Sequence, residues 1–488
     1  MIIRRVLIAN RGEIAVRVIR TCGRLGIATV LAVSDADAGS VPAALADETI
    51  GIGRAGYLSV DAVVAAAVAA GADAIHPGYG FLSENPRLAR ACEAAGIVFI
   101  GPGPEVLQAA GDKLAARAHA VAAGLPVLAG GYVSVTGADA LAGRIGYPVL
   151  VKAAGGGGGR GLRVVGEPGQ LAGAVAVASA EAEAAFGDPR VYLERYAAGA
   201  RHVEVQLLGD GRSVIHLGDR DCSVQRRYQK VIEEAPAPLL GETLRVGLRA
   251  AAVALGQHLK YSGAGTVEFL VDPAAEAFWF LEVNARIQVE HPVTEMITGV
   301  DLVAEQIAIA EGRGLGLDQA GVGLRGHAIE CRINAEDPAA GFRPSPGTVT
   351  GAVFPAGPGI RVDTHVQAGS AAPAQYDSLL AKLVVTGADR DQALARLRGA
   401  LARCRIDGVA TNLAMLAALA SDEEFAAGGV DTGWLARWLA RPPGEAGGRG
   451  PEPRLVRERR LAEQPGEARC AGGEPPLVRE KKAGEDRG

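Results

Sequence analysis

The chain has 488 residues, of which 49% are hydrophobic and 22% charged, a length that predicts about three domains and a balance typical of globular proteins. Its formal net charge of −5 gives no electrostatic reason to expect a nucleic-acid partner. No apolar run reaches the ~18 residues of a membrane helix, and the six cysteines form no CxxC pair. We therefore expect a cytoplasmic protein with free thiols and no membrane partner.

Residues 1–110 alternate between strand and helix patterns. The strand patterns cover residues 5–9, 28–33, 73–75 and 97–100. The helix pattern of residues 12–25 stops at Gly26, a glycine in the position of a helix C-cap, and a second helix pattern runs from Ser59, an expected N-cap, to Gly71. This alternation predicts an α/β fold, a Rossmann-like, doubly wound parallel sheet. The loop 76–80 (HPGYG) follows a strand at the edge where such sheets bind ligands, although its proline and glycines are also consistent with a simple turn.

The segment 111–320 opens with Gly111-Asp112-Lys113 and contains a run of glycines. A strand pattern ends at Lys152, the glycines 155–159 follow, and another strand pattern covers 162–165. Because glycine lets backbone amides approach a ligand closely, this arrangement favours a cradle over phosphates, although five glycines are also typical of a flexible linker. It is not a Walker A loop, since no Gly-Lys-Ser/Thr follows.

Three further stretches of this segment carry polar or charged side chains in recognisable patterns. Residues 191–196 form a strand pattern in a position from which the backbone can bind an adenine. Residues 201–206 alternate, so that His202, Glu204 and Gln206 share one face. Residues 219–230 are dense in charge, which by itself favours a solvated face, although the stretch carries Lys230 toward the hairpin described next.

The most informative stretch is residues 265–295. Two β-branched and aromatic runs, 265–271 and 277–283, flank a proline-containing connection, which is a hairpin signal. If Glu268 faces Glu282, these two carboxylates and the amide oxygen of Asn284 converge on one spot. Hard cations such as Mg²⁺ prefer oxygen ligands, so we predict a metal–phosphate site. A polar sheet edge in water does not account for the further polar residues crowded behind the hairpin, which are Arg286, Glu290, His291 and Glu295.

The last third of the chain predicts a mixed α+β domain and a tail. After Glu295 we expect a helix through about Glu311 and a glycine-rich link to about Arg325. Residues 326–336 alternate as a strand with Glu330 and Arg332 on one face, residues 344–385 combine strands and turns, and residues 389–440 are mostly helical. The expected domains are thus 1–110, 111–320 and 325–440. Residues 441–488 contain few bulky apolar side chains and are expected to be a disordered tail.

Taken together, eight motifs resemble those of biotin carboxylase, the ATP-grasp subunit or domain of biotin-dependent carboxylases. They are IANRGEIA (8–15), HPGYGFLSEN (76–85), GDK (111–113), GGGGGRG (155–161), RDCSVQRRYQK (220–230), EEAPAP (233–238), RIQVEHPVTEMITG (286–299) and ECRINAED (330–337). They occur in the order and at the spacing of the family, over roughly residues 2–440. The resemblance implies N- and C-terminal biotin carboxylase domains around an ATP-grasp domain, whose glycine-rich lid spans about 130–203.

The resemblance also implies a role for each matching residue. The ATP-binding positions are Lys113, Lys152, Gly158, Gly159, Glu194, Arg195, Tyr196, Ala197, His202, Tyr228, Glu268 and Glu282. Two Mg²⁺ or Mn²⁺ ions would be held by Glu268, Glu282 and Asn284. Bicarbonate would meet Lys230, Arg286, Gln288, Val289 and Glu290, and biotin would meet Tyr79, Gly80 and Arg332. Arg195 and Tyr228 depart from the lysine and histidine found in other members, which puts the fine detail of the adenosine contacts in doubt.

The reaction implied by the resemblance is ATP-dependent carboxylation of biotin by bicarbonate through carboxyphosphate. The catalytic residues would be Glu290 as general base, Lys230 and Arg286 on the bicarbonate, and Arg332 beside the biotin enolate. None of the three methionines adjoins a lysine, so the Met-Lys-Met attachment motif is absent. We therefore expect biotin on a separate biotin carboxyl carrier protein and a separate carboxyltransferase subunit; family precedent adds a homodimer.

Three questions stay open at this point. The sequence does not identify the final acceptor of the carboxyl group. The default hypothesis is acetyl-CoA, with the chain as part of the acetyl-CoA carboxylase of fatty-acid synthesis. Another ATP-grasp ligase, which passes an acyl phosphate to an amine, would share the metal hairpin. A nucleotide-binding subunit without catalysis would predict a broken set of site residues, whereas the set here is complete.

Overall fold

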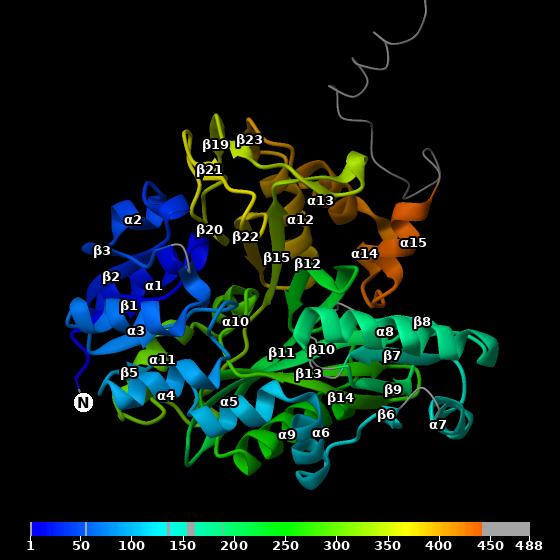
Figure 1. The fold of residues 1–488 in the computed structure, drawn as a ribbon. Helices are drawn as coiled ribbons and strands as arrows, with labels where there is room; N and C mark the ends of the chain where they lie inside the picture. Colours follow the sequence, from blue (N-terminus) through cyan, green and yellow to red (C-terminus); the bar gives the residue numbers. More distant parts are fainter. Residues whose placement is uncertain (1, 54–55, 134–136, 154–161, 188, 442–488) are drawn as a thin grey trace, which may run out of the picture. The chain divides into compact units, whose positions relative to one another are not determined.

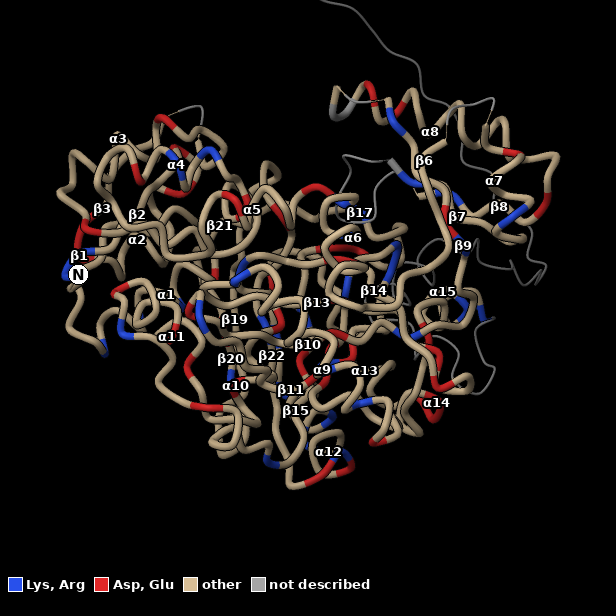
Figure 2. Tube along the Cα trace, turned by 90° about the horizontal axis from the view of Figure 1, so that it is seen from below, with Lys and Arg blue, Asp and Glu red and all other residues tan. Residues whose placement is uncertain are grey.

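The computed structural model describes residues 2–53, 56–133, 137–153, 162–187 and 189–441. The lid glycines Gly158 and Gly159 and nearly all of the expected tail, residues 442–488, lie outside the described residues. Five cysteines are free thiols in the described residues: Cys22, Cys92, Cys222, Cys331 and Cys404. No helix of the described chain is both long and apolar enough to cross a membrane. Acidic and basic residues are interspersed along the trace (Figure 2).

The N-terminal part is a parallel five-stranded sheet in the order β3-β2-β1-β4-β5 (Figure 1). Its strands are β1 (Arg5–Ile8), β2 (Ala28–Val33), β3 (Glu48–Gly51), β4 (Ala74–His76) and β5 (Val98–Phe99). Its helices are α1 (Gly12–Leu25), α2 (Val41–Leu45), α3 (Val60–Ala69) and α4 (Pro86–Ala94), with short 3₁₀ turns at Asp35–Asp37 and Gly56–Leu58. Ile14 of α1 packs on one face with Ile8, whereas Val63 of α3 and Leu88 of α4 pack on the other with Leu7. The sheet is therefore doubly wound, as predicted.

Local signals set the ends of two of these helices. Helix α1 ends at Gly26, which has a left-handed φ of 70° and closes the last turn through its backbone N–H. The side chain of Ser59 accepts a hydrogen bond from the backbone of Ala62 and caps α3. Both predictions from the sequence are confirmed.

The next part joins a helical pair to a small antiparallel sheet. Helices α5 (Pro104–Gly111) and α6 (Lys113–Ala122) meet at Asp112, whose side chain caps α6. The sheet has the order β6-β9-β7-β8. Its strands are β6 (Gly130–Val133), β7 (Val149–Ala153), β8 (Arg163–Val165) and β9 (Val191–Arg195); α7 (Ala138–Ile145), a 3₁₀ turn at Pro168–Gln170 and α8 (Leu171–Phe186) complete it. The apolar faces of α7 and α8 pack on β7 and β9, which leaves Lys152 and Glu194 for the opposite side.

A long antiparallel sheet, called the central sheet below, has the order β14-β13-β10-β11-β12-β15-β22-β20. Its strands are β10 (Arg201–Asp210), β11 (Val214–Arg226), β12 (Gln229–Ala235), β13 (Ser262–Asp272), β14 (Ala277–Asn284), β15 (His327–Asn334), β20 (Ile360–Thr364) and β22 (Leu379–Gly387). Helix α9 (Glu242–His258) covers one face, where Leu248 and Leu255 pack with Val205 and Phe269. Strand β12 precedes residues 320–325, the expected domain boundary, and β15 follows them. Because these two strands pair directly, the sheet is continuous across that boundary.

The C-terminal part mixes helices and strands, as predicted. Its helices are α12 (Arg390–Leu401), α13 (Leu413–Ser421), α14 (Glu423–Ala427) and α15 (Trp434–Ala440), with 3₁₀ turns at Gln319–Gly321 and Pro338–Ala340. Short strands are β16 (Glu336–Asp337), β17 (Arg343–Pro344), β18 (Gly347–Thr348), β19 (Gly351–Val353), β21 (Ala371–Ala372) and β23 (Arg405–Asp407). The core side chains of α12 and α13 pack on β15 and β22.

One expectation about helices is wrong. The sequence predicts a single helix after Glu295 through about Glu311, whereas the structure has α10 (His291–Thr298) and α11 (Leu302–Ala310). Gly299 ends α10 with a left-handed φ of 75°, and Asp301 caps α11 through the backbone of Ala304. The glycine and the capping aspartate together impose a break that the apolar pattern does not show.

Candidate active site

The hairpin has the register that the sequence predicts. Strands β13 and β14 pair antiparallel with Glu268 directly opposite Glu282. Val267 and Phe269 are completely buried against α9, and since alternate residues of a strand face opposite ways, Glu268 is turned to the other side of the sheet. The apolar core thus places the carboxylates in the site.

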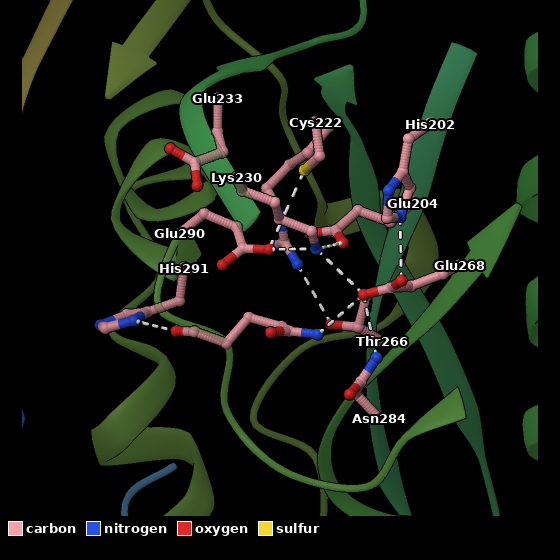
Figure 3. A network of polar contacts seen from close by, with 12 residues as sticks. His202, Glu204, Cys222, Lys230, Glu233, Thr266, Glu268, Asn284, Glu290 and His291 are labelled. Carbon is pink, nitrogen blue, oxygen red and sulfur yellow. Dashed lines mark hydrogen bonds and ion pairs between the residues drawn. The ribbon is translucent and has the colours of Figure 1, made fainter. Parts of the chain in front are cut away.

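Glu268 connects the groups around it (Figure 3). Its Oε1 accepts hydrogen bonds from Lys230 Nζ at 2.9 Å, Asn284 Nδ2 at 2.9 Å and Gln288 Nε2 at 3.2 Å. Its Oε2 lies 2.8 Å from His202 Nε2. Burial alone would raise the pKa of Glu268, but the charges of Lys230 and His202 outweigh it and hold that pKa well below its usual value. Glu268 is therefore ionised at neutral pH.

The orientation of Asn284 differs from the expectation. Its amide nitrogen, not its oxygen, points to the carboxylates and donates to Glu268 at 2.9 Å and Glu282 at 3.4 Å. Its oxygen accepts a 2.9 Å hydrogen bond from Arg286 Nη2. The prediction that an amide oxygen joins the two carboxylates is wrong for this arrangement, because the guanidinium of Arg286 takes that oxygen.

The hairpin nevertheless fits a divalent cation. Burial raises the pKa of Glu282, and the negative charge of Glu268 raises it further, by more than the charge of Lys113 offsets, so added positive charge would stabilise the pair. Glu282 lines a cavity, where a hard cation with oxygen preference can reach it. Two other groups bring possible ligand atoms within 4.8 Å, namely His202–Glu204–Glu268 and Glu204–Cys222–Glu290, but Lys230 and Arg220 already occupy their carboxylates.

Lys230 and Arg332 enclose Glu290. Lys230 Nζ donates to Glu290 Oε1 at 2.6 Å and also to Glu204 Oε2 at 2.6 Å, while Arg332 Nη2 donates to Glu290 Oε2 at 2.8 Å. Glu290 has no exposed surface. Burial would raise its pKa, but the charges of Lys230 and Arg332 hold it well below the usual value. The carboxylate is thus ionised, with both oxygens engaged.

The first part of the charge-dense stretch is not a solvated face. Asp219, Arg220 and Asp221 are buried within β11, so that interpretation is wrong for them, whereas Arg227 and Tyr228 are exposed. Each of these three buried charges has an oppositely charged partner inside the protein. Arg220 donates to four side chains: Glu204, Gln206, Thr266 and Thr294. Burial of paired charges, rather than exposure to water, explains this composition.

A cavity of about 970 Å³ collects the residues that the sequence singled out. Those lining it are Tyr79, Gly80, Lys113, Lys152, Glu194, Arg195, Tyr196, Ala197, His202, Tyr228, Lys230, Glu268, Glu282, Asn284, Arg286, Gln288, Val289 and Arg332. Glu290 is not among them, because Lys230 and Arg332 cover it. Further lining residues that the sequence did not indicate are Arg117, Gln225, Asn334, Glu336, Asp377 and Ser378.

The loop carrying Tyr79 is held at the point where the parallel sheet changes winding direction. Asn10, after β1, donates to the carbonyls of Pro77 and Tyr79, both at 2.7 Å, after β4. Gly78 has a φ of 61°, and a Cβ there would lie 2.7 Å from the Asn10 amide nitrogen, so no larger residue fits. Such crevices between neighbouring strands are the usual ligand sites of these sheets. The ligand-binding interpretation is therefore favoured over a simple turn.

Two glutamates beside the site were missed by sequence reasoning. Glu84 accepts from Arg286 Nε at 2.9 Å and from the backbone of Ala285 at 3.0 Å, and Glu233 accepts from Arg332 Nε at 2.6 Å. Both glutamates lie within the quoted motifs, at 76–85 and 233–238. Membership of a motif was the available signal, but it did not reveal the partner.

Comparison with known proteins identifies the family. Models described as the biotin carboxylase N-terminal domain, the carbamoyl-phosphate synthase L chain ATP binding domain and the biotin carboxylase C-terminal domain match residues 2–107, 112–318 and 330–437. The biotin carboxylase of Pseudomonas aeruginosa is 49% identical over 444 residues, which are 89% of this chain and 98% of the relative. The chain belongs to the biotin carboxylase family. It is accordingly an ATP-dependent ligase that carboxylates biotin.

Other similar proteins extend the comparison. A pyruvate carboxylase subunit of Methanothermobacter thermautotrophicus is 48% identical, over 88% of each chain. The crystal structure of a biotin carboxylase–β,γ-ATP complex from Campylobacter jejuni has a TM-score of 0.87 and 44% identity, over 89% of this chain and 99% of that one. The biotin carboxylase domain dimer of 2-oxoglutarate carboxylase from Hydrogenobacter thermophilus, solved with MgADP, ADP and bicarbonate, also has a TM-score of 0.87 and 44% identity, over 90% and 98%. The predicted fold class and the family resemblance are both confirmed.

Proposed function

We propose that the chain phosphorylates bicarbonate with ATP and transfers the carboxyl group to biotin on a separate carrier protein, as the first half-reaction of acetyl-CoA carboxylase. The supporting observation is a cavity that joins the acidic hairpin to Lys230, Arg286 and Arg332. This reaction requires lysines that bind the phosphates, oxygen ligands that bind a metal ion, and cationic side chains that bind a small anion.

In this proposal ATP binds across the small sheet and the hairpin. Lys113 and Lys152 hold its phosphates; burial lowers the pKa of Lys113, and the nearby Lys152 lowers it further, so an incoming polyanion relieves the repulsion between the two lysines. Glu268 and Glu282, with Asn284 after rotation of its amide, would hold Mg²⁺ or Mn²⁺, and the ion would supply positive charge to the phosphates. The relatives crystallised with nucleotide, magnesium and bicarbonate support this assignment.

Bicarbonate binds beside Lys230, Arg286, Gln288 and the backbone of Val289. Glu290 accepts its proton, and the resulting dianion attacks the γ-phosphate to give carboxyphosphate. The low pKa of Glu290 keeps it in the accepting form. Because Lys230 and Arg332 engage both of its oxygens, one of these contacts must open for bicarbonate to reach it.

Biotin occupies the side of the cavity lined by Tyr79, Gly80 and Arg332, where Arg332 stabilises the enolate. Its carrier is a biotin carboxyl carrier protein, and a carboxyltransferase subunit takes the carboxyl group onward. A homodimer is part of the proposal, in keeping with the dimeric Hydrogenobacter domain. A cytoplasmic location stays a prediction.

A second assembly is favoured by one specific observation. The pyruvate carboxylase subunit of Methanothermobacter is matched over 88% of its length with 48% identity, close to the match with stand-alone biotin carboxylases. The same half-reaction would then serve a pyruvate carboxylase, with pyruvate as the acceptor. Purification of the tagged chain from its own cells, with mass spectrometry of the bound carrier and transferase, distinguishes the two settings.

The decisive experiment measures ADP release with ATP, MgCl₂, bicarbonate and free biotin. We expect turnover that requires all four components and is abolished in Glu290→Ala, because the proton acceptor is lost. Near-normal carboxylation by Glu290→Ala would refute the assigned role. ATP turnover independent of biotin, with an amine as the acceptor, would favour another ATP-grasp ligase.

A further inference from the structure

Two buried glutamates face each other beside Arg332. Glu233 of β12 is paired directly with Glu330 of β15. Arg332 lies two residues along β15 and therefore on the same face. Neither glutamate has any exposed surface. Like charges directly opposite each other in a sheet destabilise it, so this arrangement requires that one of the charges be neutralised.

The two carboxyl groups have different partners. Glu233 Oε1 accepts a 2.6 Å hydrogen bond from Arg332 Nε and lies 2.5 Å from Nη2 of the same guanidinium. In the described part of the chain, neither oxygen of Glu330 has a hydrogen-bond partner. Lys382, opposite Arg332 on β22, instead lies 3.0 Å from Glu13 Oε1 and donates to the carbonyl of Val289. A buried carboxyl without a partner is held more cheaply as the neutral acid than as an anion.

The surrounding charges also make Glu330 the weaker acid of the two. Burial raises the pKa of Glu330 well above its usual value; Lys382 opposes this shift, and the charge of Glu233 adds to it. Burial also raises the pKa of Glu233, but Arg332 opposes it, and the result is about 7. Above neutral pH the proton therefore resides on Glu330 and the negative charge on Glu233.

We propose that Glu233 is a positioning residue that anchors Arg332 by its Nε, while Glu330 is protonated and does not compete with Glu233 for the guanidinium. Nη2 of the guanidinium lies 2.5 Å from Glu233 Oε1 and also donates to Glu290 Oε2 at 2.8 Å. With Nε and one side of Nη2 held by Glu233, the second N–H of Nη2 can leave Glu290 for a substrate atom without the side chain leaving the site.

This anchor couples the two halves of the proposed reaction, on which it rests. The bicarbonate O–H bond breaks, its electron pair stays on the attacking oxygen, and the proton forms a new O–H bond on Glu290. A neutral carboxyl attracts a guanidinium less than a carboxylate does, so Glu290 releases Nη2 of Arg332 when it takes up the proton. The released N–H can then donate to the ureido oxygen of biotin. Arg332 thus turns to biotin only after bicarbonate has been deprotonated.

The test compares Glu233→Gln with wild type. Loss of a charge-assisted anchor is expected to lower kcat/KM for biotin at least about tenfold, while the KM for ATP changes less than about twofold. Glu233→Asp, which keeps the charge but shortens the reach, should recover part of the loss. An unchanged kcat/KM for biotin in Glu233→Gln overturns the anchor.

A pH profile separates positioning from mere folding support. The groups facing Glu233 are Arg332 and Glu330 from β15, Glu290 at the start of α10, Cys222 from β11, Lys230 of its own strand and, across β15, Lys382. Wild-type activity should fall as pH drops through about 7, because protonated Glu233 releases Arg332. Glu233→Gln should lack this limb and stay low throughout. Persistence of the limb in that variant contradicts the proposal.

The place of the proton has a readout independent of activity. The infrared difference spectrum of wild type minus Glu330→Gln, recorded at pH 8, should contain the C=O stretch of a protonated carboxylic acid. Carboxylate bands in its place would show that Glu330 is charged and overturn the assignment. A wild-type protein that folds but does not carboxylate biotin would count against the proposed function instead, and the infrared result would still decide where the proton lies.

Discussion

Two carboxylates of the same hairpin hold different groups, which separates their roles residue by residue. Glu268 accepts from Lys230, Asn284 and Gln288, so it connects the proposed metal ligands to the proposed bicarbonate ligands. Glu282 accepts a longer bond from Asn284 and faces the cavity. Substitution of each by the isosteric amide therefore tests separable functions.

For Glu282→Gln we expect the Mg²⁺ concentration for half-maximal activity to rise about tenfold, with an unchanged KM for bicarbonate, because one cavity-facing charge is lost. Glu268→Gln should raise both quantities, since Lys230 also loses a partner. Activity titrations with MgCl₂ and bicarbonate measure the two effects, and each variant serves as the control for the other. Identical responses of the two variants would contradict this division of roles.

Sequence alternation was sufficient for the hairpin and insufficient for what surrounds it. The pairing of Glu268 with Glu282 follows from a local pattern in which apolar neighbours must face the core. The contact of Arg220 with Glu204 and Thr294 depends on how distant segments fold together, and no local pattern specifies it. Buried charge pairs also violate the usual association of charge with water, which explains the wrong interpretation of residues 219–221.

Among the elements, helix α12 is attached to the central sheet by its first residue. Arg390 Nε donates to Glu234 Oε2 on β12 at 2.7 Å, and its Nη atoms donate to the carbonyls of Phe425 and Ala426 at 2.8 and 2.6 Å. His327 Nε2 lies 2.8 Å from the same carboxylate. One side chain therefore links α12, β12 and the end of α14.

Arg390→Ala should destabilise the protein by about 3 kcal/mol near neutral pH, because it leaves a buried carboxylate with one partner fewer. Burial raises the pKa of Glu234, but His327 and Arg390 lower it more, so its folded pKa lies below the usual value. Such a group stabilises the fold above its unfolded pKa, and this contribution is lost as pH falls through the folded pKa. The difference between variant and wild type should therefore shrink below about pH 4. Urea unfolding at a series of pH values measures it; a pH-independent difference would assign the loss to packing.

Helix ends illustrate how far element boundaries can be predicted. Gly26 and Ser59 act through their own backbone or side chain, and both were placed correctly. The break between α10 and α11 depends on Gly299 and Asp301, within a run that is otherwise apolar at helical spacing. Stop signals inside a favourable pattern are thus the weak point of such predictions.

At the scale of the whole molecule, the cavity is built from distant parts of the chain. Tyr79 comes from the parallel sheet, Glu268 and Glu282 from the hairpin, and Arg332 from β15 beyond residue 325. The continuous central sheet fixes the hairpin and β15 relative to each other through β12. Each motif alone was modest evidence. That the motifs come together around one cavity could be predicted only because the whole set resembles one family.

Glu84 connects the parallel sheet to the proposed bicarbonate-binding residues. It follows the Tyr79 loop and accepts from Arg286 Nε at 2.9 Å and the backbone of Ala285 at 3.0 Å, some 200 residues away in sequence. Its side chain retains 36% exposure, so water screens part of the interaction. A moderate effect on the orientation of Arg286 is the physical expectation.

We predict that Glu84→Gln raises the KM for bicarbonate about fivefold and leaves the KM for ATP unchanged, because the amide keeps the shape but weakens its hold on Arg286. Glu93→Gln, an exposed glutamate on α4, is the matched control and should behave as wild type. Steady-state kinetics with bicarbonate as the varied substrate measure the effect, and thermal unfolding checks that both variants fold alike. Equal bicarbonate KM values in the two variants would mean that Arg286 is positioned from within 284–288 alone, through the side-chain oxygens of Asn284 and Gln288 and the carbonyl of Ile287.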